Sequence, residues 1–312
     1  MSFTIIDVQP DTDEWLRERR GSIGASEAPA VMNMSAYGNT PLDVYKAKQG
    51  LDREFDPVLG FIGHASEPIM HEWVERFSGL GLRLLTGFMA RSVEHPFLHA
   101  TFDRVTEDGV KVQMKTAHQY AGHHWDEGVP TDIRVQVQAE LAVSGDPRAL
   151  VVVWIGGREF RHYWEPRDDR FIRDHLLPTL GAFWHDNVLA GVTPDPSTTA
   201  ELNEMDVEER KTIEVTDTAL EAIERRAVLL SDAESMVAEA DALKVAIGAW
   251  MGDADTVTKD GRNVLTFRYQ KGRAGFDQKS FREAYPQLHN QFVTQGSPFR
   301  VMRTVKQKEQ AK

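Results

Sequence analysis

The 312-residue sequence contains no cysteine, which excludes disulfide bonds, cysteine-ligated zinc and cysteine-held iron–sulfur clusters. It also has no apolar run long enough to cross a bilayer and no secretory signal pattern. Its hydrophobic content of 41% and charged content of 27% are ordinary for a globular protein. We therefore expect a protein of a reducing cytoplasm, built as one large domain or two modest ones.

Positive charge is scarce, because 36 Lys and Arg face 48 Asp and Glu and give a formal net charge of −12. Taken alone, this balance argues against nucleic-acid binding. The charge is unevenly distributed: residues 259–312 hold 12 Lys and Arg against 4 Asp and Glu, a charge of +8, which leaves −20 on residues 1–258. The basic segment is either a phosphate-binding face or a simple segregation of charge, and composition does not decide between them.

The first 80 residues favour helices. An amphipathic helix is expected over 13–20, ending at Gly21, and Ser26 can cap a second helix over 27–32. A capping serine with free helix amides behind it suits an anion, although most such serines only cap. Glu67 lies within an expected helix over 60–77, where its simplest interpretation is an acid favoured by the helix dipole.

The middle of the chain has a mixed pattern. Strands are expected over 84–89, 98–102, 110–114, 149–155 and 159–164, and helices over 40–48, 133–144 and 168–189. After residue 194 the composition becomes polar, which places a domain boundary between residues 195 and 196.

The region 196–312 is expected to be an accessory region. A long helix over 217–251, with Asp217 as its cap, would reach about 50 Å and must lie along a partner helix, the body of the protein or another subunit. The remaining expected elements are a hairpin around 259–261, a helix over 278–285 and a final strand over 299–305.

Asp103 and the run Gln113-Met114-Lys115 form the pattern on which the functional prediction depends. Asp103 ends one expected strand, and residues 113–115 lie on the next. Two carboxylates at the ends of neighbouring strands can hold Mg²⁺, which activates water and stabilises charge on a phosphate. A lysine two residues after the second acid lies on the same strand face. Here Gln113 stands where that acid belongs, and the bare pattern is too common to identify a nuclease.

The order of motifs around this pattern resembles the YqaJ-like viral recombinase family, which includes the phage lambda exonuclease. The motifs are the segments 19–27 (RRGSIGASE), 63–68 (GHASEP), 94–98 (EHPFL), 113–117 (QMKTA), 135–138 (VQVQ) and 156–160 (GGREF). The resemblance covers roughly residues 10–190. The part after residue 200 resembles, more loosely, an accessory region of phage members.

This resemblance implies a PD-(D/E)xK nuclease with a restriction-endonuclease-like fold, in which helices flank a mixed α/β (α+β) sheet. It implies 5′→3′ digestion of one strand of duplex DNA with Mg²⁺, for which Mn²⁺ is the alternative. Asp103, Gln113, the backbone carbonyl of Met114 and Glu67 match positions at the metals, and Lys115 matches the catalytic lysine. A further metal-proximal acid of the lambda enzyme has no clear match. The positions matching a pocket for the 5′-phosphate are Arg19, Ser26, Thr101 and Gln136.

The resemblance also implies partners. It predicts a ring-shaped homo-oligomer, with a trimer favoured, threaded by double-stranded DNA that carries a 5′-phosphate end. The single strand produced would pass to a single-strand annealing protein. The protein would be encoded by a phage or prophage and act in the cytoplasm of the bacterial host, with no membrane partner.

The departure at Gln113 predicts weaker metal binding, because an amide oxygen can coordinate a cation but carries no charge. One hypothesis is an inactivated or impaired variant of an active nuclease, since Glu→Gln is the isosteric change used to trap substrate complexes. The other is a naturally degenerate copy, although the presence of both Asp103 and Lys115 favours the first. Two alternative functions are a non-catalytic DNA-end-binding or assembly module and a structure-selective endonuclease.

Overall fold

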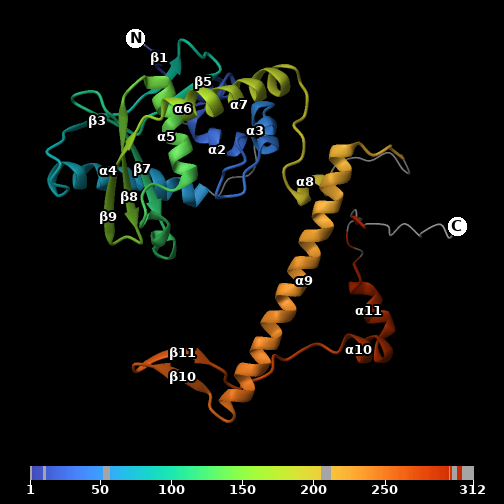
Figure 1. The fold of residues 1–312 in the computed structure, drawn as a ribbon. Coiled ribbons are helices and arrows are strands. Elements are labelled where there is room, and N and C mark those ends of the chain that lie inside the picture. Colours follow the sequence, from blue (N-terminus) through green and yellow to red (C-terminus); the bar gives the residue numbers. More distant parts are fainter. Residues whose placement is uncertain are drawn as a thin grey trace. The chain divides into compact units, whose positions relative to one another are not determined.

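The structure, a computed structural model, describes residues 2–9, 12–51, 57–204, 212–294, 296 and 301–303. The chain divides into two compact units, Met1–Glu204 and Met205–Lys312 (Figure 1). The boundary expected after residue 195 precedes helix α8 (Thr199–Glu204), which belongs to the first unit. No helix within the described ranges is long and apolar enough to span a membrane.

The first unit contains two mixed sheets. One has the strand order β3–β6–β7–β8–β9, in which β7 and β8 are parallel and the other neighbours are antiparallel. The other has the order β1–β4–β5–β2, in which β2 and β5 are parallel. The strands are β1 (Phe3–Ile6), β2 (Ile23–Gly24), β3 (Leu84–Thr86), β4 (Met89–Ser92), β5 (Leu98–Thr101), β6 (Arg104–Thr106), β7 (Lys111–Ala117), β8 (Arg148–Ile155) and β9 (Glu159–Pro166).

Helices flank these sheets, as predicted. The helices of the first unit before residue 150 are α1 (Asp13–Arg20), η1 (Ala25–Glu27), α2 (Ala28–Val31), α3 (Pro41–Lys48), α4 (Pro57–Arg76), η2 (Gln119–Trp125) and α5 (Thr131–Ser144). The helix expected over 168–189 is present as the run α6 (Asp169–Phe171), η3 (Ile172–Leu176), α7 (Leu177–Ala182) and η4 (Phe183–Leu189), in which η3 and η4 are π-helical.

Strand β8 is apolar along its length because helices cover both of its faces. Leu150 and Val152 pack in a cluster with Met70 of α4, whereas Val151 and Val153 belong to the larger core that α5 shares. Parallel strands that are covered on both sides read as continuous apolar runs rather than alternating ones. Helix α5 also packs on β4 and β5, so it contacts strands of both sheets.

Two antiparallel chain segments cross from one sheet to the other at Gly87 and Asp103. The sequence pattern predicted one strand over 84–89, which is wrong, because the chain leaves β3 at Thr86 and enters β4 at Met89. Gly87 N donates to Asp103 O at 3.2 Å, and Phe102 N donates to Phe88 O at 3.0 Å, so the pairing continues through the crossing. A Cβ on Gly87 would lie 1.7 Å from the carbonyl oxygen of Phe102, and only glycine allows this approach.

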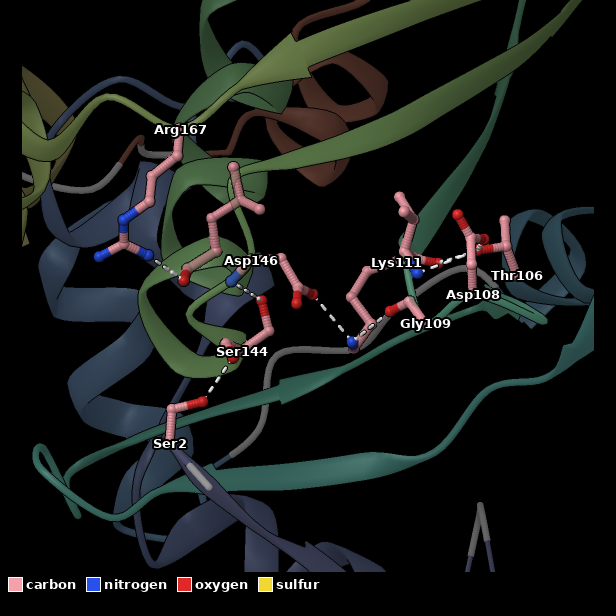
Figure 2. Close-up of polar contacts among 10 residues, drawn as sticks. Ser2, Thr106, Asp108, Gly109, Lys111, Ser144, Asp146 and Arg167 are labelled. Atoms are coloured by element: carbon pink, nitrogen blue, oxygen red, sulfur yellow. Dashed lines mark hydrogen bonds and ion pairs between the residues drawn. The ribbon is translucent and has the colours of Figure 1, made fainter.

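A buried lysine joins the β6–β7 turn to the end of α5 (Figure 2). Lys111 Nζ binds Asp146 Oδ2 at 2.8 Å and lies 5.4 Å from the centre of the Phe102 ring. Ser2, just before β1, donates its hydroxyl proton to the carbonyl of Ser144, the last residue of α5. These contacts hold the N-terminal strand, which the sequence pattern did not predict, against the core.

In the described residues of the second unit, the first helix is α9 (Asp217–Met251), and its bounds agree with the prediction. Its cap is Thr216, whose side chain accepts from Ala219 N, so the expected cap at Asp217 is wrong by one residue. The hairpin and the helix expected over 278–285 are present. The further elements are β10 (Thr256–Lys259), β11 (Arg262–Thr266), α10 (Gln278–Ala284) and α11 (Pro286–Phe292). Of the strand expected over 299–305, only residues 301–303 are described, and they form no strand.

The crossing makes Gly87→Ala strongly destabilising. The added methyl group meets a backbone oxygen that cannot rotate away, so we expect the free energy of unfolding to fall by ~1–3 kcal/mol. Gly63→Ala is the matched control, because Gly63 lies within α4 with no atom within 4 Å of an added Cβ. Helix propensity predicts a gain of up to ~1 kcal/mol there. Urea unfolding of both variants measures the difference, and similar stabilities would contradict the proposed constraint.

Candidate active site

Asp103 lies at the crossing between the two sheets, and one of its carboxyl oxygens is held by two donors. Its Oδ2 accepts from Met114 N at 2.7 Å and from Gln113 Nε2 at 2.7 Å. Within the described part of the chain, Oδ1 accepts no hydrogen bond. The arrangement orients the carboxyl group while leaving one oxygen available for a ligand.

Burial raises the pKa of Asp103 to about 6, and the negative charge of Glu67 acts in the same direction. Lys115, the N–H of Met114 and Arg104 oppose this rise. Desolvation therefore outweighs the nearby donors and cations, as it does for many functional carboxyl groups.

Gln113 is buried on β7, and both ends of its amide are bound. Its Nε2 donates to Asp103, and its Oε1 accepts from Gln136 Nε2 at 3.1 Å. A carboxylate in the same place would put an oxygen against Asp103 Oδ2, where only a proton or a cation could relieve the repulsion. The Gln113 amide instead hydrogen-bonds to both Asp103 and Gln136 without an added proton or cation.

Lys115 and Gln136 complete the same network. Lys115 lies on the same face of β7 as Gln113, and its Nζ donates to Gln136 Oε1 at 2.9 Å. The structure therefore joins Asp103, Gln113, Lys115 and Gln136 in one chain of hydrogen bonds. The sequence predicted all four as site residues; the assignment of Gln136 to the 5′-phosphate pocket stays a prediction, and the structure places this residue beside the lysine.

Glu140 is an additional member of the network that the sequence analysis missed. It is one turn after Gln136 on α5, is 1% exposed, and accepts from Gln136 Nε2 at 2.9 Å. Burial raises its pKa to about 8, assisted by the charge of Asp103, while the Gln136 bond and Lys115 oppose the rise. Its spacing of four residues from Gln136 places both on one helix face, but such spacing is common among helical acids and does not single Glu140 out.

Glu67 lies near Asp103 but is paired with a cation. Arg104 donates from Nη1 to Glu67 Oε2 at 2.8 Å and also to the backbone oxygen of Asp103. Arg104, which the sequence analysis did not select, therefore connects the helix α4 acid to the crossing. Its charge offsets that of Glu67, so Glu67 contributes little net negative charge to the site.

The remaining predicted residues, Arg19, Ser26 and Thr101, lie on α1, on η1 and at the end of β5. In the described ranges, no hydrogen bond joins them to Asp103, Gln113, Lys115 or Gln136. Ser26 and Thr101 are exposed, and the guanidinium carbon of Arg19 lies 4.5 Å from the centre of the Trp15 ring.

The prediction that Ser26 caps a helix is wrong, because the chain enters helix α2 through the 3₁₀ turn η1. Glu27 Oε2 accepts a hydrogen bond from Gly24 N at 2.7 Å and also forms an ion pair with Lys48 Nζ at 2.6 Å. Lys48 Nζ donates further to the carbonyl of Arg19 at 2.8 Å. This buried lysine fixes α1, η1 and α3 to one another, and the hydroxyl of Ser26 is left facing solvent.

Among the residues that the structure describes, no group of three or more His, Asp or Glu side chains is arranged to hold a metal ion. The donors near Asp103 are carboxyl, amide and backbone carbonyl oxygens. Such hard ligands fit Mg²⁺ or Mn²⁺, which in proteins commonly keep several waters and need few carboxylates. The residues present therefore fit a divalent cation at Asp103.

Comparisons with known proteins show the family and the fold of the chain. A family model described as the YqaJ-like viral recombinase domain matches residues 14–147. The YqaJ protein of Bacillus subtilis (strain 168) is 30% identical over 255 residues, which cover 78% of this chain and 79% of that protein.

Among solved structures, LHK-Exo, an alkaline exonuclease from Laribacter hongkongensis, is similar in its complex with dAMP, with a TM-score of 0.50 at 18% identity. That match covers 58% of this chain and 94% of the other. The structure of LHK-Exo described without dAMP gives a TM-score of 0.48 at 19% identity, with the same coverage. At this identity the likeness to the dAMP complex shows a shared fold.

The raised pKa of Glu140 predicts a pH-dependent effect of Glu140→Gln in metal-free buffer. Because folding raises this pKa from 4.5 to about 8, the stabilising contribution of the carboxyl is present below pH 4.5 and is lost as the pH rises through about 8. The variant should therefore match the parent near pH 4.5 and exceed it by ~2–4 kcal/mol at pH 8.5. Chemical unfolding at several pH values measures this difference.

Glu94→Gln is the control for that series, since the Glu94 side chain is 86% exposed and lies outside the network. A stability difference between Glu140→Gln and the parent that does not change with pH would contradict the assignment.

Proposed function

Because the chain belongs to the YqaJ-like viral recombinase family, we propose that it is a deoxyribonuclease that digests duplex DNA from an end, in the 5′→3′ direction and with Mg²⁺. The observation that carries this proposal is the network of Asp103, Gln113, Gln136 and Lys115 at the crossing of the two sheets. A shared fold with an alkaline exonuclease that has been solved with dAMP supports a nucleic-acid substrate.

Asp103 Oδ1, the amide oxygen of Gln113 and the backbone carbonyl of Met114 are the groups that would hold Mg²⁺, with Mn²⁺ as the alternative. Glu67 would contribute only through its pair with Arg104. When bound, the metal supplies a water of lowered pKa and stabilises negative charge on the phosphate. Lys115, held by Gln136 at 2.9 Å, is positioned to orient or deprotonate that water.

Gln113 limits the proposed activity. Its amide oxygen can bind a cation but brings no charge, and it is already bound to Gln136 in the metal-free site. Metal binding therefore competes with that hydrogen bond for the amide oxygen and gains less electrostatic energy than with a glutamate. We infer that this chain is an impaired form of a nuclease rather than a protein with unrelated chemistry.

The Gln113→Glu change should increase the rate at which end-labelled linear duplex is degraded with Mg²⁺ by tenfold or more, because the added carboxylate strengthens the metal site in the transition state. Asp103→Asn in the same background is the control and should abolish degradation. No degradation by Gln113→Glu, with DNA ends still bound, would identify a non-catalytic end-binding module. Cleavage of closed circular duplex would identify an endonuclease.

The proposed pocket for the 5′-phosphate is tested in the Gln113→Glu background on duplexes that carry a 5′-phosphate or a 5′-hydroxyl. Arg19, Ser26, Thr101 and Gln136 supply a cation, two hydroxyls and an amide, which suit a terminal phosphate. The phosphorylated end should be degraded at least tenfold faster, and Arg19→Ala should remove the preference. Arg17→Ala, on the same helix and exposed, is the matched control. If the 5′-phosphate and 5′-hydroxyl duplexes are degraded at equal rates, Arg19, Ser26, Thr101 and Gln136 do not form a 5′-phosphate pocket.

The assembly that we propose is a homo-oligomer, with a trimer favoured, which passes its single-stranded product to an annealing protein. The apolar side chains along α9 support an association of this kind, since Leu220, Ile223, Val237 and Trp250 are all exposed within the second unit. We also propose that the protein is encoded by a phage or prophage and acts inside the bacterial host cell.

A further inference from the structure

Glu140 is a buried carboxyl group for which the proposed reaction gives no role. Its side chain lies in the middle of α5, a helix whose residues are buried from Val135 to Leu141. Burial of this acid raises its pKa despite the nearby Lys115, so its charge is poorly compensated, and a neutral amide could accept the same bond from Gln136. Packing alone therefore does not explain an acid at this position.

The position of Glu140 relative to Gln113 is fixed by a shared donor. Gln136 Nε2 contacts Glu140 Oε1 at 2.9 Å and Gln113 Oε1 at 3.1 Å, so these two oxygens lie no more than 6.0 Å apart. Gln113 in turn contacts Asp103. Helix α5 packs on strands of both sheets, which holds Glu140 at this distance from the site.

The oxygen donors around Asp103 suit a divalent cation, but the nearby charges largely cancel. Asp103 is negative, but Lys115 is positive and lies in the same network. Glu67 is neutralised by Arg104. With an amide at position 113, Glu140 is the carboxyl group of this network that can add negative charge next to Asp103.

We propose that Glu140 supplies, from helix α5, the negative charge that position 113 lacks, and thereby strengthens the binding of a divalent cation at Asp103. This inference depends on the metal site of the proposed function. Glu140 acts across the Gln136 amide and is a positioning residue. A cation at Asp103 favours the ionised form of a neighbouring acid, so the two charges support each other.

With Glu140 supplying charge, the site would bind a divalent cation despite the neutral Gln113. The Glu140 carboxylate on helix α5 lies within 6.0 Å of the Gln113 amide oxygen on strand β7, the upper limit set by the two Gln136 contacts. Outer partners of a metal site typically alter metal affinity by roughly 10–100-fold, and this is the range expected for Glu140.

The test measures the affinity of the full chain for Mn²⁺ without DNA, by electron paramagnetic resonance of the free ion or by calorimetry. Glu140→Gln should weaken binding by roughly 10–100-fold, and Glu140→Asp, which keeps the charge, should weaken it much less. The exchange variant Gln113→Glu/Glu140→Gln returns the carboxylate to β7 and should restore affinity to at least the parent value. Asp103→Asn should abolish binding.

These variants separate the possible outcomes. If Glu140→Gln binds Mn²⁺ as tightly as the parent while Asp103→Asn does not bind, Glu140 has no such role and the proposed function stands. If the exchange variant binds as weakly as Glu140→Gln although both are folded, the charge explanation is wrong. If the parent and Asp103→Asn bind equally, the metal site itself is misplaced and both proposals fail. If Glu140→Gln does not fold, Glu140→Asp still decides, because it keeps the charge: affinity that falls as far as in Asp103→Asn would contradict the proposal.

Discussion

The bond from Met114 N to the carboxylate of Asp103 connects the two halves of the candidate site. Asp103 belongs to the segment that leaves one sheet, and Met114 lies in the middle of the other sheet. A carboxyl group taken out of water needs such donors, since desolvation already raises its pKa to about 6. Every other contact of the network follows from this placement, because Gln113 reaches Asp103 only when β7 runs alongside the crossing.

Hydrophobic periodicity was sufficient to predict the elements in which apolar residues recur regularly along the chain. The bounds of α9 follow from a regular apolar stripe, and β8 follows from an unbroken apolar run covered on both faces. The alternation of side chains placed Gln113 and Lys115 on one strand face. The ordered motifs around them then identified residues that no local rule would have selected, such as Gln136.

Features that arise from distant parts of the chain were not predictable in this way. The alternating strand pattern continues through Gly87, so it does not reveal that the strand breaks there. Strand β1 is held in the sheet by its pairing with β4, which the local sequence does not indicate. Ser26 carried a cap signal, but a buried Glu27–Lys48 pair formed the turn instead. The sequence does not distinguish Glu140 from other helical acids, because its burial beside Gln136 depends on tertiary packing.

The crossing at Gly87 and Asp103 also determines how the first unit can open. The backbone hydrogen bonds from Gly87 N to Asp103 O and from Phe102 N to Phe88 O continue the ladder from one sheet to the other. Local unfolding of β4 and β5 would therefore also break the backbone bond to Asp103. The strand that carries Thr101 and the strand that carries Lys115 therefore belong to one cooperative unit. A partly unfolded molecule would therefore lose the proposed 5′-phosphate pocket and the proposed metal site together.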